Sequence, residues 1–572
     1  MLPLCGLFLL VLGVTNASAQ PSVSEGVPAW QQRATAIGVA RNGTSIQAVR
    51  GATPAVGDPR PRVLYVIAPV SRQAFDRIAV GLLEAIGDDA MICRSVIVPR
   101  EFAADDASGD PTRGHPPEGG FYDHPTRPEA RYVWRWIGME APDLVVEVAY
   151  GPGETWFVPD VDLPQLRDLS LRLPGAQPLP PSDHLASQLV VERPAGVGVV
   201  PAVRVVTDGP HFVATLEAAV TRMRLPPSPA RVELKRRAAR SARDIAAQLL
   251  AVYGQKLDNV QYIPALALIG RLRQERIDHG PTAGPAPIVL AATAPFVTGG
   301  KSALDGPGGS SVYPGHLVFG ELAAMSGDRR CVDLVRAAAN AAFDADGTPR
   351  EAMPQHNEMS DAVFMGCPVL AQAAALTGEA KYADACVRNL RFIRGLCRRA
   401  DGLYRHSPLD EAAWGRGNGF PALGLCWSLD ELPESSPVRD ELLAAHREHL
   451  TALLPHQDST GCWHQVIDRP ESYREFTATA MITYALMRGI RAGRLDARSY
   501  GPAVERAWEA IRLRVAVDGG LVDVCTGTGK QKNLRDYYDR PAILGRDDRG
   551  GAMALLVATE RQLYELLRES PR

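Results

Sequence analysis

Residues 322–328, LAAMSGD, and residues 374–379, AALTGE, belong to two copies of one repeated unit, and this repeat decides the fold of the C-terminal part of the chain. In each copy an apolar helical pattern ends in a glycine turn, and a second amphipathic segment follows. That second segment leads in both copies to an Asp-Gly pair, at 346–347 and at 401–402. A unit of about 50 residues has the size of one αα-hairpin repeat.

The repeat continues toward the C-terminus. Thr460-Gly461 and Asp518-Gly519 mark further turns of the same kind, and strand signals fade from about residue 230 onward. Such hairpins can stack as an open solenoid or close into a barrel. A length of about 340 residues and roughly six hairpins fits closure. We therefore predict an all-α (α/α)6 barrel over residues 226–572.

Residues 61–225 have a different pattern, in which short apolar runs alternate with helical segments. The runs at 62–68, 94–99 and 143–148 have the length and composition of buried strands. Alternation of this kind predicts an α/β domain with a parallel or mixed sheet covered by helices. The chain is thus predicted to be multidomain, with the α/β domain preceding the barrel.

The N-terminal residues resemble an export signal. Residues 2–14 form an apolar run, and Ala-Ser-Ala at 17–19 is a small-residue cleavage pattern, so residues 1–19 are predicted to be a signal peptide. The apolar run is shorter than the ~20 residues that a transmembrane helix needs. We expect a secreted or periplasmic protein without a membrane anchor. Residues 20–60, rich in Ala, Gly, Pro and Ser, are predicted to be a linker.

The composition is that of a globular protein, with 46% hydrophobic and 22% charged residues. A formal net charge of −3 gives no indication of a nucleic-acid partner. The nine cysteines form no CxxC pair and no Cys/His zinc spacing, so no metal site is predicted from them. The sequence does not indicate an oligomeric state.

Asp361 stands at the start of a long apolar helical pattern, in the stretch SDAVFMGCP at 360–368. A carboxylate at this place can cap the helix and complement its dipole. It can also act as a general acid or base, if apolar neighbours such as Phe364 and Met365 desolvate it and raise its pKa. The residues alone leave both interpretations open.

The stretch WGRGNGF at 414–420 combines three glycines with aromatic, cationic and amide side chains. Trp414 and Phe420 offer aromatic surface, and an indole can stack on a sugar face. Arg416 can hold a carboxylate through two hydrogen bonds, and Asn418 adds an amide. The alternative is a glycine-rich turn whose tryptophan packs inward and whose arginine pairs with Asp410 or Glu411.

Three histidines, His356, His406 and His464, each follow a glycine turn. In a closed barrel the equivalent loops lie at one rim, so the three are candidates for one site, although surface loops also tolerate histidine. A third polar stretch, CTGTG at 525–529, lacks the GxxxxGK[ST] spacing of a phosphate loop. We predict instead a polar loop at the border of a pocket, with Thr526 and the downstream Tyr538 as binding candidates.

Several of these motifs occur in the same order in a known group. Residues of about 300–565 resemble the glycoside hydrolase family 88/105 group, the unsaturated glucuronyl and rhamnogalacturonyl hydrolases. The resemblance rests on the motifs SDAVFMGCPVLAQAAALTGEAKY (360–382), DGLYRH (401–406), WGRGNGF (414–420), TATAMITYALMRGIRAG (477–493), CTGTG (525–529), the tyrosine pair 537–538 and DDRGGAMALLVATE (547–560). It implies an (α/α)6 barrel and oligosaccharide substrates whose non-reducing end carries a Δ4,5-unsaturated uronic acid.

The resemblance also implies a reaction. An acid protonates the vinyl-ether double bond, water adds at C5, and the hemiketal opens, without displacement at the anomeric carbon. By motif position Asp361 is implied as the catalytic residue, with His406, Trp414 and Arg416 near the substrate. An acidic oligosaccharide is the implied partner, and no organic cofactor or metal is implied.

One departure from the family pattern leaves alternatives open. Ser310 stands where the family often has a second acidic residue, and Asp305 lies five residues earlier. A catalytically impaired, acidic-glycan-binding pseudoenzyme is therefore one alternative. Another (α/α)6 enzyme, such as a sugar epimerase that uses His356 and His464 as acid and base, is the other.

Residues 102–148 resemble zinc carboxypeptidase-like domains. Those domains bind zinc through a His and a Glu of one short motif and a later His. Here APVSR at 68–72 contains no HxxE, and Val148-Ala149-Tyr150 contains no histidine. We expect a degenerate, metal-free domain, with an unrelated site of His115, His124 and Glu129 as the alternative.

Overall fold

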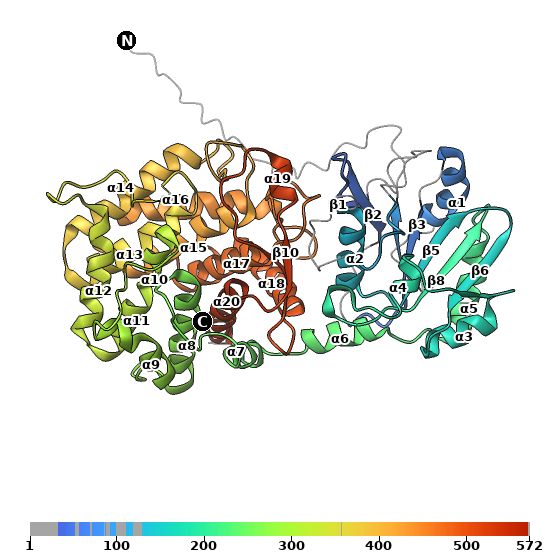
Figure 1. Ribbon diagram of the computed structural model, residues 1–572, viewed down its shortest axis with the longest axis horizontal. Helices are drawn as coiled ribbons and strands as arrows, with labels where there is room; N and C mark the ends of the chain where they lie inside the picture. Colours follow the sequence, from blue (N-terminus) through green and yellow to red (C-terminus); the bar gives the residue numbers. More distant parts are fainter. Residues whose placement is uncertain are drawn as a thin grey trace, which may run out of the picture.

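The computed structural model describes residues 33–51, 57–68, 71–84, 86, 92–98, 110–117, 128–355 and 357–569. They form two lobes, an α/β lobe and a larger helical lobe, with helix α6 (Pro229–Ala238) running between them (Figure 1). Among the helices of these residues, none combines the length and the low polarity that a membrane crossing requires.

The α/β lobe is built on a sheet of eight described strands in the order β1-β2-β4-β3-β5-β8-β6-β7. Strands β4, β3, β5 and β8 run parallel, β2 is antiparallel to β4, and β6 is antiparallel to β8. The predicted α/β domain is confirmed, and its sheet is mixed. The strand bounds are β1 Ala34–Val39, β2 Ser45–Arg50, β3 Arg62–Ile67, β4 Cys93–Val98, β5 Leu144–Tyr150, β6 Glu154–Pro159, β7 Gln177–Leu179 and β8 Ala202–Thr207.

The central strands are buried along their length. Residues 63–67 of β3 are all buried, which explains why this strand is a continuous apolar run rather than an alternating one. The helices of this lobe are α1 (Arg72–Glu84), α2 (Pro128–Glu140), α3 (Pro164–Arg172), α4 (Leu185–Gln188) and α5 (Phe212–Met223).

The predicted linker at 20–60 is wrong for part of its length. Strands β1 and β2 lie within it and form an antiparallel hairpin at the edge of the sheet. Gly43 has a φ of +88° in the turn between them, a conformation that glycine adopts without strain. Residues 1–32 lie outside the described part of the chain, so the signal peptide stays a prediction. The boundary after residue 225 also stays a prediction, because α6 packs against both α2 and the barrel.

The helical lobe is a closed ring of six inner elements. Each inner element packs against the next, and the last packs against the first. The predicted (α/α)6 barrel is confirmed by this closure. The inner elements are α8 (Tyr262–His279), the pair α10 (Val312–Gly315) and α11 (Leu317–Ser326), α13 (Ala362–Thr377), α15 (Gly415–Glu431), α17 (Phe476–Arg491) and α20 (Asp548–Glu569).

The outer helices are α7 (Ala242–Leu250), α9 (Pro287–Val297), α12 (Arg329–Ala339), α14 (Ala380–Cys397), α16 (Arg439–Leu453) and α18 (Ala497–Arg514). In α12 the buried residues are Cys331, Val335, Ala338 and Ala339, the spacing of a one-sided amphipathic helix. In the inner helix α13, residues 362–374 are buried on every side. A helix that is buried all round needs no polar face, which explains its apolar sequence.

The two lobes share an apolar interface. The short elements β9 (Leu521–Cys525), α19 (Leu534–Tyr538) and β10 (Ala542–Gly545) of the barrel face the α/β lobe (Figure 1). Trp414 and Tyr537 belong to the same buried apolar cluster as the strands of the sheet. Arg135 of α2 donates to Asp523 of β9 at 2.7 Å, and both side chains are buried.

Candidate active site

Asp361 lies immediately before α13, at the N-terminal end of an inner helix, and its residue surface is only 7% exposed. Its side chain makes no capping hydrogen bond to the helix. Atom Oδ1 is buried and has no hydrogen-bond partner among the described residues. The expectation of a capping hydrogen bond is therefore wrong, and a catalytic role of Asp361 stays a prediction.

The environment of Asp361 favours its protonated form. Burial raises the pKa of Asp361 to about 7, and the Arg416 guanidinium limits this rise. Burial, rather than a neighbouring carboxylate, causes the shift. A general acid or base works best when its pKa lies near the working pH, because both protonation states are then populated.

His406, Trp414 and Arg416 surround this carboxyl group. His406 Nε2 lies 3.6 Å from Asp361 Oδ1, and the rings of His406 and Trp414 have centroids 4.4 Å apart. The guanidinium carbon of Arg416 lies 4.7 Å from the Trp414 ring centroid. The structure thus brings together four residues that lie at three separate sequence motifs.

Gly417 makes this close packing possible. A Cβ atom added there would lie 2.9 Å from Ser360 Oγ and 3.0 Å from an atom of the Trp414 ring. Such distances are too short for a side-chain carbon, so only glycine fits. Of the three glycines in the WGRGNGF stretch, Gly417 therefore allows the Trp414 ring to approach the residue before Asp361.

Tyr537 is a site residue that the sequence analysis did not select. Its hydroxyl lies 3.0 Å from His406 Nδ1. The hydroxyl of the predicted candidate Tyr538 instead donates to Glu471 Oε1 at 2.6 Å, although both tyrosines pack in the apolar cluster shared with the sheet. Consecutive residues of a helix point about 100° apart, so only one of the two can face His406. The prediction for Tyr538 is corrected in favour of Tyr537.

Arg416 has a different partner from the one predicted. Its Nη1 donates to the Cys525 carbonyl at 2.7 Å and its Nη2 to the Thr526 carbonyl at 2.6 Å. The guanidinium group of Arg416, predicted to bind a substrate carboxylate, therefore holds the 525–529 loop. The alternative pairing also fails, because Glu411 pairs with Arg405 and Asp410 accepts from the Ala412 amide.

Thr526 sits in this loop and is half-buried. Its hydroxyl accepts a hydrogen bond from Arg540 Nη2 at 3.2 Å, while its carbonyl accepts the bond from Arg416. The loop that borders the site is therefore held by one arginine at its backbone and another at its side chain. A direct contact of Thr526 with substrate stays a prediction.

The side chains of Asn418 and Phe420 make their contacts within the protein. The Asn418 amide accepts from the Tyr404 backbone at 2.8 Å and donates to the carbonyls of Tyr404 and Trp414 at 2.7 and 3.0 Å. Phe420 packs in the core, with its ring centroid 5.5 Å from that of Phe364. Both side chains are fully engaged by the protein, so the prediction that they bind substrate is corrected to a supporting role.

The remaining candidates from the sequence are two histidines, His356 and His464, and the pair Ser310 and Asp305. His464 is held by the Ser472 carbonyl at 2.7 Å and lies 3.4 Å from Asp458, and His356 lies outside the described residues. Ser310 is buried in the short helical turn Gly309–Ser311, which packs against α13. Asp305 is exposed.

The residues considered for a metal in the α/β lobe have other partners. His115 Nε2 lies 2.9 Å from the Pro111 carbonyl, and its ring stacks on Trp134 at 5.4 Å. Glu129 accepts from the Arg41 amide at 2.9 Å, and His124 lies outside the described residues. Within the described ranges, no group of three His, Cys, Asp or Glu side chains is arranged to hold a metal ion. That the domain is metal-free stays a prediction.

A closed ring of αα-hairpins defines an (α/α)6 barrel, and the buried carboxyl group of Asp361 lies at the N-terminal end of one of its inner helices. Residues 314–564 match the sequence model of Glycosyl Hydrolase Family 88, and this region is a domain of that family. The match leaves out the α/β lobe and α8, the inner helix that completes the ring.

Curated relatives are similar over part of the chain. Unsaturated rhamnogalacturonyl hydrolase YesR of Bacillus subtilis is 33% identical over 156 residues, which are 27% of this chain and 43% of that protein. An unsaturated 3S-rhamnoglycuronyl hydrolase of an Alteromonas species is 30% identical over 175 residues, 28% of this chain and 42% of that protein. The chain thus spans less than half the length of these relatives.

Among solved structures, a possible member of the GH105 family from Klebsiella pneumoniae is 22% identical. The similarity covers 58% of this chain and 93% of that one, with a TM-score of 0.47.

Proposed function

We propose that the barrel is a glycoside hydrolase that removes a Δ4,5-unsaturated uronic acid from the non-reducing end of acidic oligosaccharides. The observation that carries this proposal is Asp361, a buried carboxyl group with a pKa of about 7 that does not cap its helix. The family 88 match and the names of the two curated relatives, both hydrolases of unsaturated sugars, support the substrate class.

The reaction needs one group that works first as an acid and then as a base. Protonated Asp361 donates its proton to C4 of the C4=C5 double bond, which leaves a cation at C5 stabilised by the ring oxygen. Water adds at C5 and gives its proton to the Asp361 carboxylate, so the acid is regenerated. The C5 hemiketal opens to a C5 ketone and a C1 hemiacetal. Collapse of this hemiacetal to the C1 aldehyde breaks the bond to the leaving sugar and releases it, with one water consumed overall. Because burial alone raises the pKa of Asp361, no paired carboxylate is needed to tune it.

Two buried polar atoms beside Asp361 are suited to bind substrate hydroxyls. Trp414 Nε1 and Ser360 Oγ are buried and have no hydrogen-bond partner within the described residues. Buried polar atoms are rarely left unpaired, because each costs the desolvation of a donor or acceptor. The faces of the Trp414 ring are contacted by His406 and Arg416, so its N–H rather than its ring face is the contact we assign to the sugar.

The proposal is tested with a panel of lyase-generated oligosaccharides. Turnover removes the ultraviolet absorbance of the unsaturated uronyl group, and the digest that reacts fastest identifies the substrate. In H₂¹⁸O the label should enter at C5 of the released keto acid, because water adds there. Label at C1 of the uronic acid, as displacement at the anomeric carbon would give, or no turnover on any digest, would overturn the mechanism.

We also propose that the protein acts outside the cytoplasm, in secreted or periplasmic form. The apolar run and small-residue pattern of residues 1–19 support this location. Cell fractionation with an antibody, together with N-terminal sequencing of the mature protein, tests it. An unprocessed chain in the cytoplasm would contradict it.

A further inference from the structure

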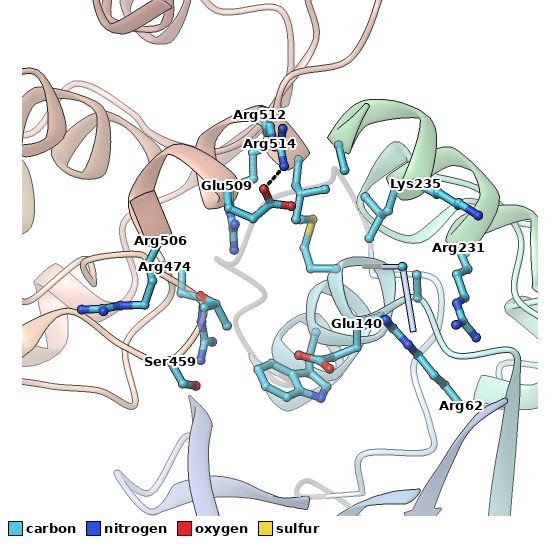
Figure 2. A pocket seen from close by; sticks show the side chains of 18 of the residues that line it. Arg62, Glu140, Arg231, Lys235, Ser459, Arg474, Arg506, Glu509, Arg512 and Arg514 are labelled. Carbon is cyan, nitrogen blue, oxygen red and sulfur yellow. Dashed lines mark hydrogen bonds and ion pairs between the residues drawn. The ribbon is translucent and has the colours of Figure 1, made fainter. Parts of the chain in front are cut away.

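A cavity of about 720 Å³ lies between the α/β lobe and the barrel, and we call it the interdomain pocket (Figure 2). Helix α2 contributes Trp136 and Met139, helix α6 contributes Lys235, and the barrel contributes Arg474, Arg506 and Arg514. None of its lining residues belongs to the cluster around Asp361. Its volume is in the range of pockets that hold small molecules.

The lining of the interdomain pocket is strongly cationic. Seven lining residues are Arg or Lys and two are Glu. Both glutamates are already neutralised, because Glu140 pairs with Arg50 at 2.9 Å and Glu509 pairs with Arg512. Burial and the nearby Arg231 both lower the pKa of Arg62, as expected where cations repel one another. The pocket therefore has an excess of positive charge.

Three of the lining cations have no acidic partner. Within the described residues, no carboxylate lies at ion-pair distance from Lys235, Arg506 or Arg514. The Nε and Nη2 atoms of Arg506 donate to the neutral amide oxygen of Gln457 at 3.1 and 2.6 Å. An anionic group in the pocket would supply the missing countercharge.

Of these three cations, Arg514 has the greatest need of a counterion, because its surface is only 3% exposed. Its Nη1 donates to the Ala510 carbonyl at 3.1 Å, and its Nε has no partner in the part of the chain that the structure describes. A buried charge is costly unless it is paired and hydrogen-bonded. The cost would fall if an anion completed the hydrogen bonds of this guanidinium.

Arg474 offers a second buried donor at the same pocket. It is 8% exposed, its Nε lies 2.5 Å from Asp458 Oδ2, and its guanidinium lies over the Trp136 ring at 4.9 Å. Its Nη2 is buried without a hydrogen-bond partner among the described residues. The pairing with Asp458 and the contact with Trp136 fix the orientation of the Arg474 guanidinium, and so the direction in which Nη2 can donate.

We propose that the interdomain pocket is a second binding site, which takes an acidic sugar through its carboxylate. Arg514 and Arg474 hold the carboxylate, and the exposed Lys235 attracts it at the mouth. Planar guanidinium groups bind carboxylates through two hydrogen bonds, and the side chains of Met139 and Leu513 offer apolar surface to the C–H face of a sugar. The choice of an acidic sugar over a free phosphate rests on the proposed function.

A ligand in this pocket would contact both lobes. Helices α2 and α6 form one wall, and helix α18 forms another (Figure 2). The same walls are linked by Arg237 and Arg240, which donate to the carbonyls of Leu513 and Arg512 at 3.1 and 2.8 Å. The α/β lobe thereby gains a role in capturing the acidic oligosaccharide, separate from its cleavage at Asp361.

Saturated digalacturonate is the probe for this site. It carries two carboxylates but no C4=C5 double bond, so the proposed reaction cannot consume it. Isothermal titration of the full chain should give binding of digalacturonate, and weaker or no binding of neutral galactobiose and of inorganic phosphate. Arg514→Met should weaken the Kd at least about tenfold, since hydrogen bonds to charged groups are lost.

Lys235→Gln tests the site without touching a buried residue. It should weaken the Kd about two- to fivefold, the size of an exposed charge interaction. Arg236→Gln is the matched control, because Arg236 is the next residue on α6, pairs with Glu233 and does not line the pocket. Its Kd should equal that of the wild type.

Several results would overturn the proposal. They are equal binding of galactobiose, tighter binding of phosphate than of digalacturonate, an unchanged Kd in Arg514→Met and Lys235→Gln, and loss of binding in Asp361→Asn instead. Turnover of unsaturated substrates is measured separately. If turnover is absent while digalacturonate still binds through Arg514, the proposed function fails and the second site stands.

Discussion

Replacement of Asp361 by asparagine separates the chemistry of this carboxyl group from its place in the fold. Asparagine has nearly the same size but cannot donate or accept the reacting proton. A positioned acid or base contributes ~10²–10⁴-fold to a rate, so kcat should fall at least ~100-fold. In the wild type, kcat/KM should decline as the pH rises through about 7, because the protonated form starts the reaction.

The same variant should change stability in a pH-dependent way. Burial raises the pKa of Asp361 from 3.8 to about 7, so the folded state holds this proton more tightly than the unfolded state. The stability that this group contributes is fully present below pH of about 4 and is lost as the pH rises to about 7. At 1.36 kcal/mol for each pKa unit, the loss is at most about 4 kcal/mol. Asp361→Asn lacks this loss and should exceed the wild type in stability at pH 8.

The assay combines turnover on the reactive digest with thermal unfolding between pH 4 and pH 8. Glu358→Gln is the matched control, because Glu358 is an exposed carboxyl group three residues earlier, paired with Lys530. It should leave kcat within about twofold of the wild type, as expected for a surface substitution. Near-normal turnover of Asp361→Asn would refute the catalytic assignment. A fall in stability of Asp361→Ala with full turnover would restore the capping interpretation.

Three other predictions concern Tyr537, the buried ion pair between the lobes and the metal content of the α/β lobe. Tyr537→Phe removes the hydroxyl beside His406 and should lower kcat about three- to tenfold, whereas Tyr538→Phe, measured in the same assay, should not. Asp523→Asn breaks the buried pair with Arg135 and should lower the free energy of unfolding in urea by about 3–5 kcal/mol; a loss below about 1 kcal/mol would contradict a buried ionic pair. Metal analysis of the purified chain should find no stoichiometric zinc, and one zinc per chain would disprove the metal-free expectation for residues 61–225.

The barrel could be predicted from the sequence because its local signals agree with its fold. Gly327 and Gly378 end two inner helices with φ values of +70° and +72°, a conformation that favours glycine. The repeat of these turns therefore marks the hairpins directly. The hairpin β1–β2 could not be recognised as easily. Its strands are six residues long. Strand β2 pairs with β4 and strand β1 packs against α2, and both of these partners come later in the chain.

The site could be predicted only in part. The motifs locate Asp361, His406 and Trp414, but they do not give the phase of the five-residue helix α19, so Tyr537 and Tyr538 could not be told apart. Arg416 donates to two backbone carbonyls, and because every residue has a carbonyl, the sequence cannot indicate which ones it binds. The interdomain pocket depends on packing between α2, α6 and α18, and no local pattern records such packing.

The contact between α8 and α20 closes the ring, and it has a consequence for how the protein is made. Helix α8 is the first inner helix to leave the ribosome, and its partner α20 spans residues 548–569. About 270 of the 572 residues must be translated between them, so the buried side of α8 lacks its partner for about half of synthesis. At 5–20 residues per second this exposure lasts on the order of 10 to 60 s. We therefore expect chaperones to bind the nascent chain until the last helix emerges.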